Sequence, residues 1–198
     1  MLLDGNEAPE DGVLQALSGA GAGQLPEFEH AWRMLDAERR ALIVSRLRDI
    51  AREDVESEFS TVFRVGLRDA DPRVRTASAQ GLWEDESPDV ITPLVAALKQ
   101  DSAESVRAAA AQALGHFLYA SETGRLNAAR GREVYDALLH AARRAPDETP
   151  VFQRALESLG YSGTPDVDFF LRSALASDDP GLRLSAVIGM GRSNNQAY

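Results

Sequence analysis

Apolar and small residues recur at helical spacing in four ten-residue segments that align without gaps. The segments are VRTASAQGLW (74–83), VRAAAAQALG (106–115), VFQRALESLG (151–160) and LRLSAVIGMG (182–191). In each segment these residues fall at i, i+3, i+4, i+7 and i+8, which is one face of an α-helix. The pattern predicts four related helices whose small residues allow close approach to neighbours.

A second amphipathic segment precedes each of these helices, so that every repeat is predicted to be helix A, a tight turn and helix B. The preceding segments are residues 59–69, 90–100, 132–144 and 167–177. Asp71, Thr149, Thr164 and Asp179 each stand before a proline, which is typical of a helix N-cap followed by proline at the first helical position. Asp101 and Glu104 have capping-box spacing.

The segments 27–36 and 37–53 form a degenerate leading pair, with Asp36 as the predicted cap between them. Trp32 is expected in the core of this pair, on one helical stripe with Phe28 and Leu35. The pattern predicts an all-α superhelix, or solenoid, of about five helix-turn-helix repeats. We place the leading pair at 27–53 and the repeats at about 56–84, 88–118, 130–161 and 165–192, within a domain spanning 26–198.

Residues 1–25 lack sustained periodicity, and we expect an acidic flexible tail with a short helical stretch near 13–17. The interval between the second and third helix B is 45 residues, against 32 and 31 for the others. The excess predicts either a longer helix B with a neutral loop or an insertion on a functional face.

The pattern L-x-D-x-D-P-x-V-R-x-x-A-x-x-x-L in residues 67–82, echoed in 98–115, resembles the HEAT repeat, especially the short bacterial form shared with phycobilin-lyase subunits. The resemblance covers roughly residues 56–192. It implies a ladder of polar residues from the A–B turns and the starts of helix B. The ladder positions would be Asp69 with Arg75, Asp101 with Arg107, and Arg183 with Ser177 in the Asp place. The third repeat has Phe152 and Pro146 at these positions, which predicts an interrupted ladder.

The composition limits the chemistry that this chain can perform. The hydrophobic fraction of 44% is sufficient for a buried core, and no cysteine is present. A disulfide framework, a thiolate zinc site and a cysteine nucleophile are therefore excluded. No apolar run approaches the roughly 18 residues of a membrane span, and the N-terminus lacks a secretory pattern. We therefore expect a cytoplasmic protein.

The charge balance argues against nucleic acid. The net charge is −10, and residues 1–30 contain six acidic residues and no Lys or Arg. A HEAT-like DNA-binding module would need a basic concave face to bind a phosphate backbone. Nucleic acid is therefore an improbable partner.

We find no candidate catalytic residues, metal site or cofactor site. Among His30, His116 and His140, only His140 has a carboxylate at helical spacing, Asp136, and such a pair is more often a surface contact than half a metal site. Neither a phosphate-binding glycine loop nor a nucleophile elbow appears. These observations predict that the chain is not an enzyme.

The resemblance implies that helix B lines a concave surface, so the outward residues of the B helices are the candidate partner-binding residues. They are Arg73, Thr76, Gln80, Trp83 and Glu84 in the first repeat, Ser105, Ala108, Gln112, His116 and Tyr119 in the second, and Gln153 and Glu157 in the third. Trp83 either packs over the next repeat junction or anchors a partner at the rim. This polar, weakly charged set favours a protein or peptide ligand.

The first functional hypothesis is therefore a non-catalytic interaction scaffold or adaptor. The alternative, which rests on the resemblance, is a bilin-lyase-like chromophore-handling or enzyme-accessory subunit. The last helix B is apolar on more than one face, with Leu184, Val187, Ile188 and Met190. This predicts either a longer repeat array, of which the chain is a truncated part, or a homodimer through the last repeat.

Overall fold

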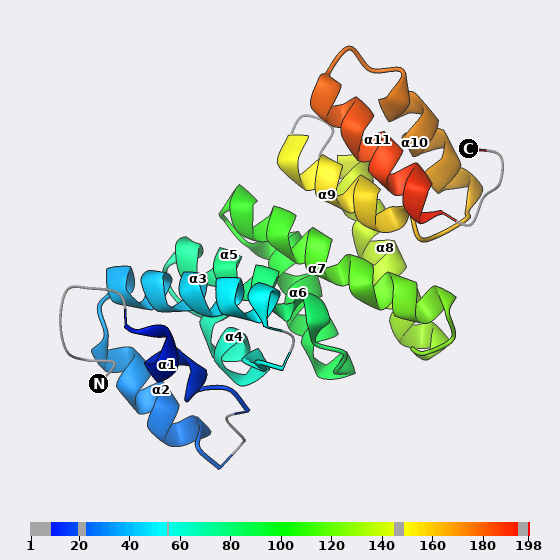
Figure 1. Cartoon of the computed structure of the whole chain (residues 1–198). Helices are drawn as coiled ribbons and strands as arrows, with labels where there is room; N and C mark the ends of the chain where they lie inside the picture. Colours follow the sequence, from blue (N-terminus) through cyan, green and yellow to red (C-terminus); the bar gives the residue numbers. More distant parts are fainter. Residues whose placement is uncertain (1–8, 20–22, 55, 145–148, 194–197) are drawn as a thin grey trace. The chain divides into compact units, whose positions relative to one another are not determined.

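We analysed a computed structural model, which describes residues 9–19, 23–54, 56–144, 149–193 and 198. The side chains of Glu84 and Thr149 also lie outside the described part. None of the described residues forms a β-strand. The chain folds into helices (Figure 1), which are α1 (Asp11–Gln15), α2 (Leu25–Met34), α3 (Ala37–Glu53), α4 (Ser60–Gly66), α5 (Pro72–Gly81), α6 (Ile91–Gln100), α7 (Glu104–Glu122), α8 (Ala128–Arg144), α9 (Thr149–Leu159), α10 (Pro165–Leu175) and α11 (Pro180–Arg192), with the 3-10 turns η1 (Leu82–Glu84) and η2 (Pro88–Val90).

The helices form two compact units, residues 1–85 (unit 1) and residues 86–198 (unit 2). The sequence pattern predicted one repeat domain from residue 26 onward. The boundary follows η1, where the helix-B segment of the first repeat ends in a 3-10 turn.

Unit 1 contains the leading pair, α2 and α3, and the first repeat, α4 and α5. The bounds of α2 and α3 match the predicted segments within two residues, and the Asp36 side chain accepts the Arg39 amide as the predicted cap. Trp32 is buried, as expected of a core residue. Helix α3 packs along α5, so the two B helices are adjacent.

Residues 9–19 differ from the predicted flexible tail, because they carry a packed helix. Helix α1 lies against α3, and its Leu14 is completely buried. The Asp11 carboxylate accepts two hydrogen bonds from the Arg46 guanidinium of α3, at 2.8 and 2.7 Å. One buried leucine and one ion pair thus hold a segment that lacks a sustained hydrophobic pattern against α3.

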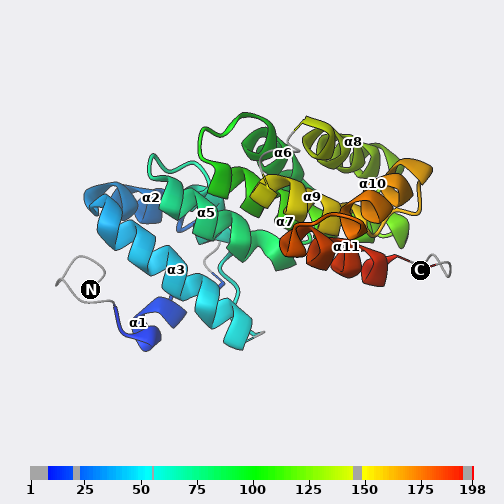
Figure 2. The same ribbon diagram turned by 90° about the horizontal axis from the view of Figure 1, so that it is seen from above.

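Unit 2 has two layers of helices. The A helices α6, α8 and α10 cover one side of the B helices, and α9 packs between α7 and α11 (Figures 1 and 2). A Cβ atom added at Gly160 would lie 2.3 Å from the backbone oxygen of Gly189, and one at Gly115 would lie 2.6 Å from Oγ of Ser158. Small residues are therefore required where successive B helices meet, as the sequence pattern predicted.

The long interval between the second and third helix B is mostly helix. Helix α7 continues to Glu122, two turns beyond the aligned segment, and α8 begins at Ala128. Between them Gly124 has φ +73°, a left-handed conformation that favours glycine. This is the longer helix B that one of the two sequence interpretations predicted.

Candidate partner-binding surface

The three predicted ladder arginines bind the same backbone groups in their repeats. Each donates through Nη1 to the carbonyl oxygens five and six residues earlier, in the A–B turn. The distances are 2.8 and 2.9 Å for Arg75 to Ala70 and Asp69, 3.2 and 2.9 Å for Arg107 to Ser102 and Asp101, and 2.8 and 2.9 Å for Arg183 to Asp178 and Ser177. Each arginine therefore stabilises the turn that precedes its own helix.

The side chain of each turn residue accepts a hydrogen bond from the backbone N–H two residues later in the chain. Oδ1 of Asp69 accepts from Asp71, Oδ1 of Asp101 from Ala103, and Oγ of Ser177 from Asp179, at 2.9, 2.9 and 3.1 Å. Serine can replace aspartate here because both side chains form this kind of turn. The predicted capping box is wrong, because Ala103 and not Asp101 is the N-cap of α7. The Asp101 side chain accepts the Ala103 amide within the turn.

The ladder is interrupted in the third repeat, as predicted for Phe152. Phe152 stands at the sequence position of the arginine, and the centre of its ring lies 6.3 Å from that of Phe170. Pro146, at the Asp position of that repeat, lies outside the described residues.

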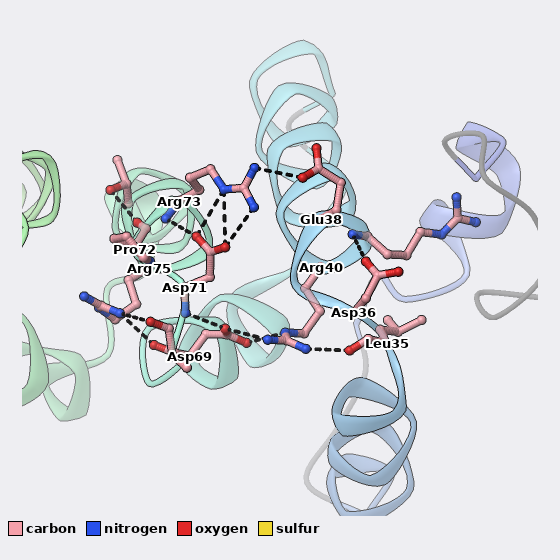
Figure 3. A network of polar contacts seen from close by, with 12 residues as sticks. Leu35, Asp36, Glu38, Arg40, Asp69, Asp71, Pro72, Arg73 and Arg75 are labelled. Carbon is pink, nitrogen blue, oxygen red and sulfur yellow. Dashed lines mark hydrogen bonds and ion pairs between the residues drawn. The ribbon is translucent and has the colours of Figure 1, made fainter.

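Unit 1 contains a fourth ladder arginine, Arg40, which the sequence reasoning missed. It follows the cap Asp36 by four residues, as Arg75 follows Asp71, and Nη1 donates to the Leu35 carbonyl at 2.5 Å. Its Nε and Nη2 also donate to Oδ2 and Oδ1 of Asp69 in the next repeat, at 2.7 and 3.1 Å (Figure 3). The shared Asp-x-x-x-Arg spacing was the signal that could have identified it.

Asp69 is the centre of this network. Its side chain is only 4% exposed and accepts four hydrogen bonds, from Arg40 twice, from the Asp71 amide, and from Nε1 of Trp32 at 2.9 Å. The carboxylate joins the leading pair to the first repeat, because Trp32 lies on α2 and Arg40 on α3. Its burial and full hydrogen bonding identify Asp69 as a structural residue.

The candidate partner-binding residues on α5 mostly contact their own unit. Arg73 pairs with Asp71 and with Glu38 of α3, at 2.9 and 3.0 Å. Gln80 accepts a hydrogen bond from Arg48 of α3 at 2.8 Å, and the Thr76 hydroxyl donates to the Pro72 carbonyl at 2.8 Å. The adjacent α3 therefore already binds two of the three side chains.

Trp83 lies in η1 and is 42% exposed. The side chain of Glu84, predicted beside it, lies outside the described part.

The candidate residues of α7 are more open. Gln112 and Tyr119 are exposed, and Nε2 of His116 lies 3.9 Å from a carboxylate oxygen of Glu86. The outward positions predicted for Ala108 and Glu157 are wrong, because both residues are buried. The Glu157 side chain lies under α11, where Oε1 accepts a hydrogen bond from Ser185 of α11 and Oε2 accepts one from Arg154.

Four side chains of unit 2 form a continuous row of aromatic rings and guanidinium groups, which we call the aromatic–arginine row. The Arg125 guanidinium lies 5.2 Å from the centre of the Tyr119 ring, the Tyr119 and Tyr161 rings are 5.2 Å apart, and the Arg192 guanidinium lies 5.3 Å from the Tyr161 ring. Such contacts hold the side chains in place. The row extends along the ends of α7, α9 and α11.

Of this row the sequence analysis identified only Tyr119. His116, Tyr161 and Arg192 each follow directly after an aligned ten-residue segment, so the register could have placed Tyr161 and Arg192 on one edge. Two further contacts hold the ends of the row. Arg125 pairs with Glu86 at 3.0 Å, and Arg192 donates to the Glu157 carbonyl at 2.9 Å.

Comparison with known proteins agrees with this geometry. Residues 60–149 match a family model described as HEAT repeats. Residues 60–149 are HEAT repeats. A comparison with curated proteins gives no match.

Two solved structures share the HEAT-like fold of this chain. One is the complex of CpcE and CpcF of phycocyanin lyase from Nostoc sp., with TM-score 0.58 and 19% identity, covering 86% of this chain and 99% of that chain. The other is an engineered protein, with TM-score 0.55 and 16% identity, covering 96% of this chain and 95% of the other. The fold is of the all-α solenoid class, as the sequence predicted.

Two features are absent from the described part of the chain. No group of three or more His, Cys, Asp or Glu there could hold a metal ion. No helix there has the length and apolar character needed to cross a membrane.

Proposed function

We propose that this chain is a non-catalytic scaffold in the cytoplasm that binds a protein or peptide partner on its helix-B face. The observation that carries the proposal is the aromatic–arginine row. Tyrosine and arginine are enriched among the residues that dominate binding energy at protein interfaces. Tyr119 is 43% exposed, and its position is fixed by Tyr161 and Arg125, so little side-chain entropy is lost on binding.

Affinity capture from the native host with the tagged full-length chain tests this proposal. We expect specific partners to bind the wild type and to be lost with Tyr119→Ala/Tyr161→Ala, as measured by quantitative mass spectrometry. Phe169→Ala is the matched control, because Phe169 is a 68% exposed aromatic residue on the A helix α10. Partners retained equally by all three proteins would remove the row from consideration.

Charge reversal at Arg73 is a poorer test. Arg73→Glu would place a new carboxylate beside Asp71 and Glu38, which now bind the guanidinium. A loss of binding could then come from disturbed packing of α3 on α5.

The alternative function is that of a bilin-handling or enzyme-accessory subunit. The likeness to a phycocyanin lyase structure, at 19% identity, supports the fold and carries no activity to this chain. Incubation with free bilin followed by gel filtration distinguishes the two functions. Visible absorbance that elutes with the protein would favour the alternative, whereas the scaffold proposal expects colourless protein.

Self-association through the last repeat is a separate prediction. Leu184 and Val187 of α11 are 61% and 55% exposed, which is unusual for two apolar residues one turn apart. We expect light scattering to report a dimer that Leu184→Glu/Val187→Glu converts to a monomer. A wild-type monomer at high micromolar concentration would contradict self-association. It would not affect the proposal that a partner binds the aromatic–arginine row.

A further inference from the structure

Unit 1 contains a pocket that is lined by both of its helix pairs. The pocket has a volume of about 450 Å³, a size typical of sites for small ligands. Its lining comes from α2, the start of α3, the end of α4 and the turn that follows α4. The lining residues are Glu29, Trp32, Arg33, Arg40, Val65, Arg68, Asp69 and Ala70, all within the described part of the chain. We call this site the ladder pocket.

The buried polar groups of the ladder pocket bind one another. The Asp69 carboxylate is 4% exposed and pairs with Arg40 at 2.7 Å (Figure 3). It also accepts a hydrogen bond from Nε1 of Trp32 at 2.9 Å. Arg40 is 15% exposed, and all three of its guanidinium nitrogens donate to Asp69 or to the Leu35 carbonyl. This pair therefore fixes the lining in place without adding net charge to it.

The other two arginines of the lining are open to a ligand. Arg68 is exposed, and its side chain makes no ion pair or hydrogen bond within the part of the chain that the structure describes. Arg33 is 66% exposed, and its ion pair with Glu29 on the same helix is 3.6 Å long. An exposed pair of this kind contributes little stability and is easily exchanged. Three arginines and two carboxylates leave one positive charge in the lining.

Apolar surface lies in the same lining as these two arginines. It is provided by Val65, Ala70 and the indole of Trp32. The hydrogen bond to Asp69 and the Phe28 ring, whose centre is 5.5 Å away, hold the indole in one orientation. The lining therefore combines a fixed apolar surface with two exposed guanidinium groups.

This combination favours a monoanion with an apolar body. The planar guanidinium group matches the two oxygens of a carboxylate, and one carboxylate would balance the single positive charge of the lining. A phosphate monoester carries roughly −1.5 to −2 at neutral pH, which is more than the lining balances. A cation would be repelled by Arg33 and Arg68.

We propose that the ladder pocket binds a carboxylate that carries a small apolar or aromatic group. Arg33 and Arg68 bind the carboxylate oxygens, and the apolar group packs against Trp32 and Val65. The C-terminal residue of a peptide and a free carboxylic acid both present this chemistry. The proposal goes beyond the scaffold function, because the pocket shares no residue with the aromatic–arginine row.

Trp32 provides the signal for the test, because it belongs to the lining. The chain has two tryptophans, so NMR spectra of the isotope-labelled full-length chain contain two indole N–H signals, which Trp83→Phe assigns. The probes are phenylacetate, its neutral analogue phenylacetamide, acetate and N-acetyl-Gly-Phe with a free C-terminus. We expect saturable shifts of the Trp32 signal with phenylacetate and with the dipeptide, and none with phenylacetamide.

The relative affinities of the probes identify the ligand more closely. Acetate should bind more weakly than phenylacetate, because it has no apolar group to cover Trp32 and Val65. Tighter binding of the dipeptide than of phenylacetate would assign a peptide C-terminus as the source of the carboxylate. The opposite order would assign a free carboxylic acid.

Two double variants of equal charge provide the control. Arg33→Ala/Arg68→Ala should weaken phenylacetate binding by roughly two- to thirty-fold, the effect of two exposed ion pairs. Arg52→Ala/Arg132→Ala removes the same charge from exposed positions on α3 and α8, and should leave the binding unchanged. All four replaced arginines are exposed, so both variants should keep the dispersed amide spectrum of the folded chain.

Three results would overturn the proposal. They are the absence of a saturable Trp32 shift with either carboxylate, phenylacetamide binding as tight as that of phenylacetate, and equal losses in the two charge variants. Acetate binding as tight as that of phenylacetate would contradict the apolar part of the site. Loss of partner capture with intact phenylacetate binding would instead count against the scaffold function alone.

Discussion

The two units repeat one motif but connect its copies differently. In unit 1 a buried carboxylate, Asp69, receives the guanidinium of Arg40 and the indole N–H of Trp32 from the preceding pair. In unit 2 the B helices meet through Gly115, Gly160 and Gly189, where no larger residue fits. The first connection depends on a fully satisfied polar network, and the second on close approach of backbones.

The comparison separates two roles that the ladder combines. The ladder arginine binds the carbonyls of its own turn, and this is the same at Arg75, Arg107 and Arg183. Asp69 also contacts the preceding pair, through Arg40. The last repeat has Ser177 in the Asp place, and its turn keeps the hydrogen bonds from Arg183 and from the Asp179 amide.

The largest expected effect is that of Asp69→Ala. It leaves the half-buried Arg40 and the Trp32 indole without their acceptor, and breaking such a buried pair costs about 3–5 kcal/mol. Ser177→Ala, at the same turn position in unit 2, removes one hydrogen bond to a backbone amide and should cost about 1 kcal/mol or less. Urea denaturation gives both values, and equal losses would contradict the distinction between the units.

Next in size is the effect of a methyl group at the glycine contact of unit 2. Gly160→Ala forces the α9 and α11 backbones apart, and overpacking of this kind costs about 1–3 kcal/mol. Gly191→Ala lies on α11 with nothing within 4 Å of its new Cβ, so its helix propensity should make it neutral or slightly stabilising. Thermal unfolding gives the melting temperatures of both variants. Similar values would show that the α9 and α11 backbones can move apart without a loss of stability.

A smaller effect is expected at the N-cap of α5. Asp71→Ala removes the acceptor of the Arg73 amide and should cost about 1 kcal/mol. The Arg73 guanidinium, and then its backbone amide, hold the pKa of Asp71 below its ordinary 3.8. The contribution is therefore present above pH 3.8 and lost as the pH falls through the lower folded-state pKa. Stability measured from pH 6 to pH 2 should fall less steeply in the variant than in the wild type.

The smallest effect is expected from Arg183→Ala, which frees the carbonyls of Ser177 and Asp178 to water. Arg183 is exposed, so the loss should be about 0.5 kcal/mol, the lower end for a hydrogen bond. Arg132→Ala controls for the loss of an exposed charge. If the two variants unfold at the same denaturant concentration, the arginine does not stabilise its turn.

The repeat could be predicted from the sequence because each copy carries its own helix signals. Periodic apolar positions, Asp-Pro steps and small residues act over a few residues, so the helices α2, α3, α5 and α9 begin and end near the predicted places. The short helical stretch near 13–17 was predicted, and α1 covers Asp11–Gln15. Its packing was missed because the segment has no sustained hydrophobic pattern, and the burial of Leu14 depends on α3.

The candidate site was predicted less completely. Tyr119 was found as an outward residue of helix B, whereas Glu157 was misplaced because the sequence pattern treats each helix alone. Polar positions are assigned to solvent by that pattern, yet α11 covers Glu157 and supplies Ser185 and Arg192 as its partners. Arg48 and Glu38 likewise bind Gln80 and Arg73 from a neighbouring helix.

The sequence alone was enough to predict the HEAT repeats of residues 60–149, the A–B alternation and the turn-binding arginines Arg75, Arg107 and Arg183, because these depend on contacts within about ten residues. Only the tertiary structure decided which polar groups satisfy one another, such as Asp69 with Arg40 and Trp32. It also decided which side chains of different repeats lie in one row, as Tyr119, Tyr161 and Arg192 do. The physical reason is that side-chain direction and helix packing bring together residues that are 29 to 42 positions apart, and a pattern within one helix carries no information about contacts over that separation.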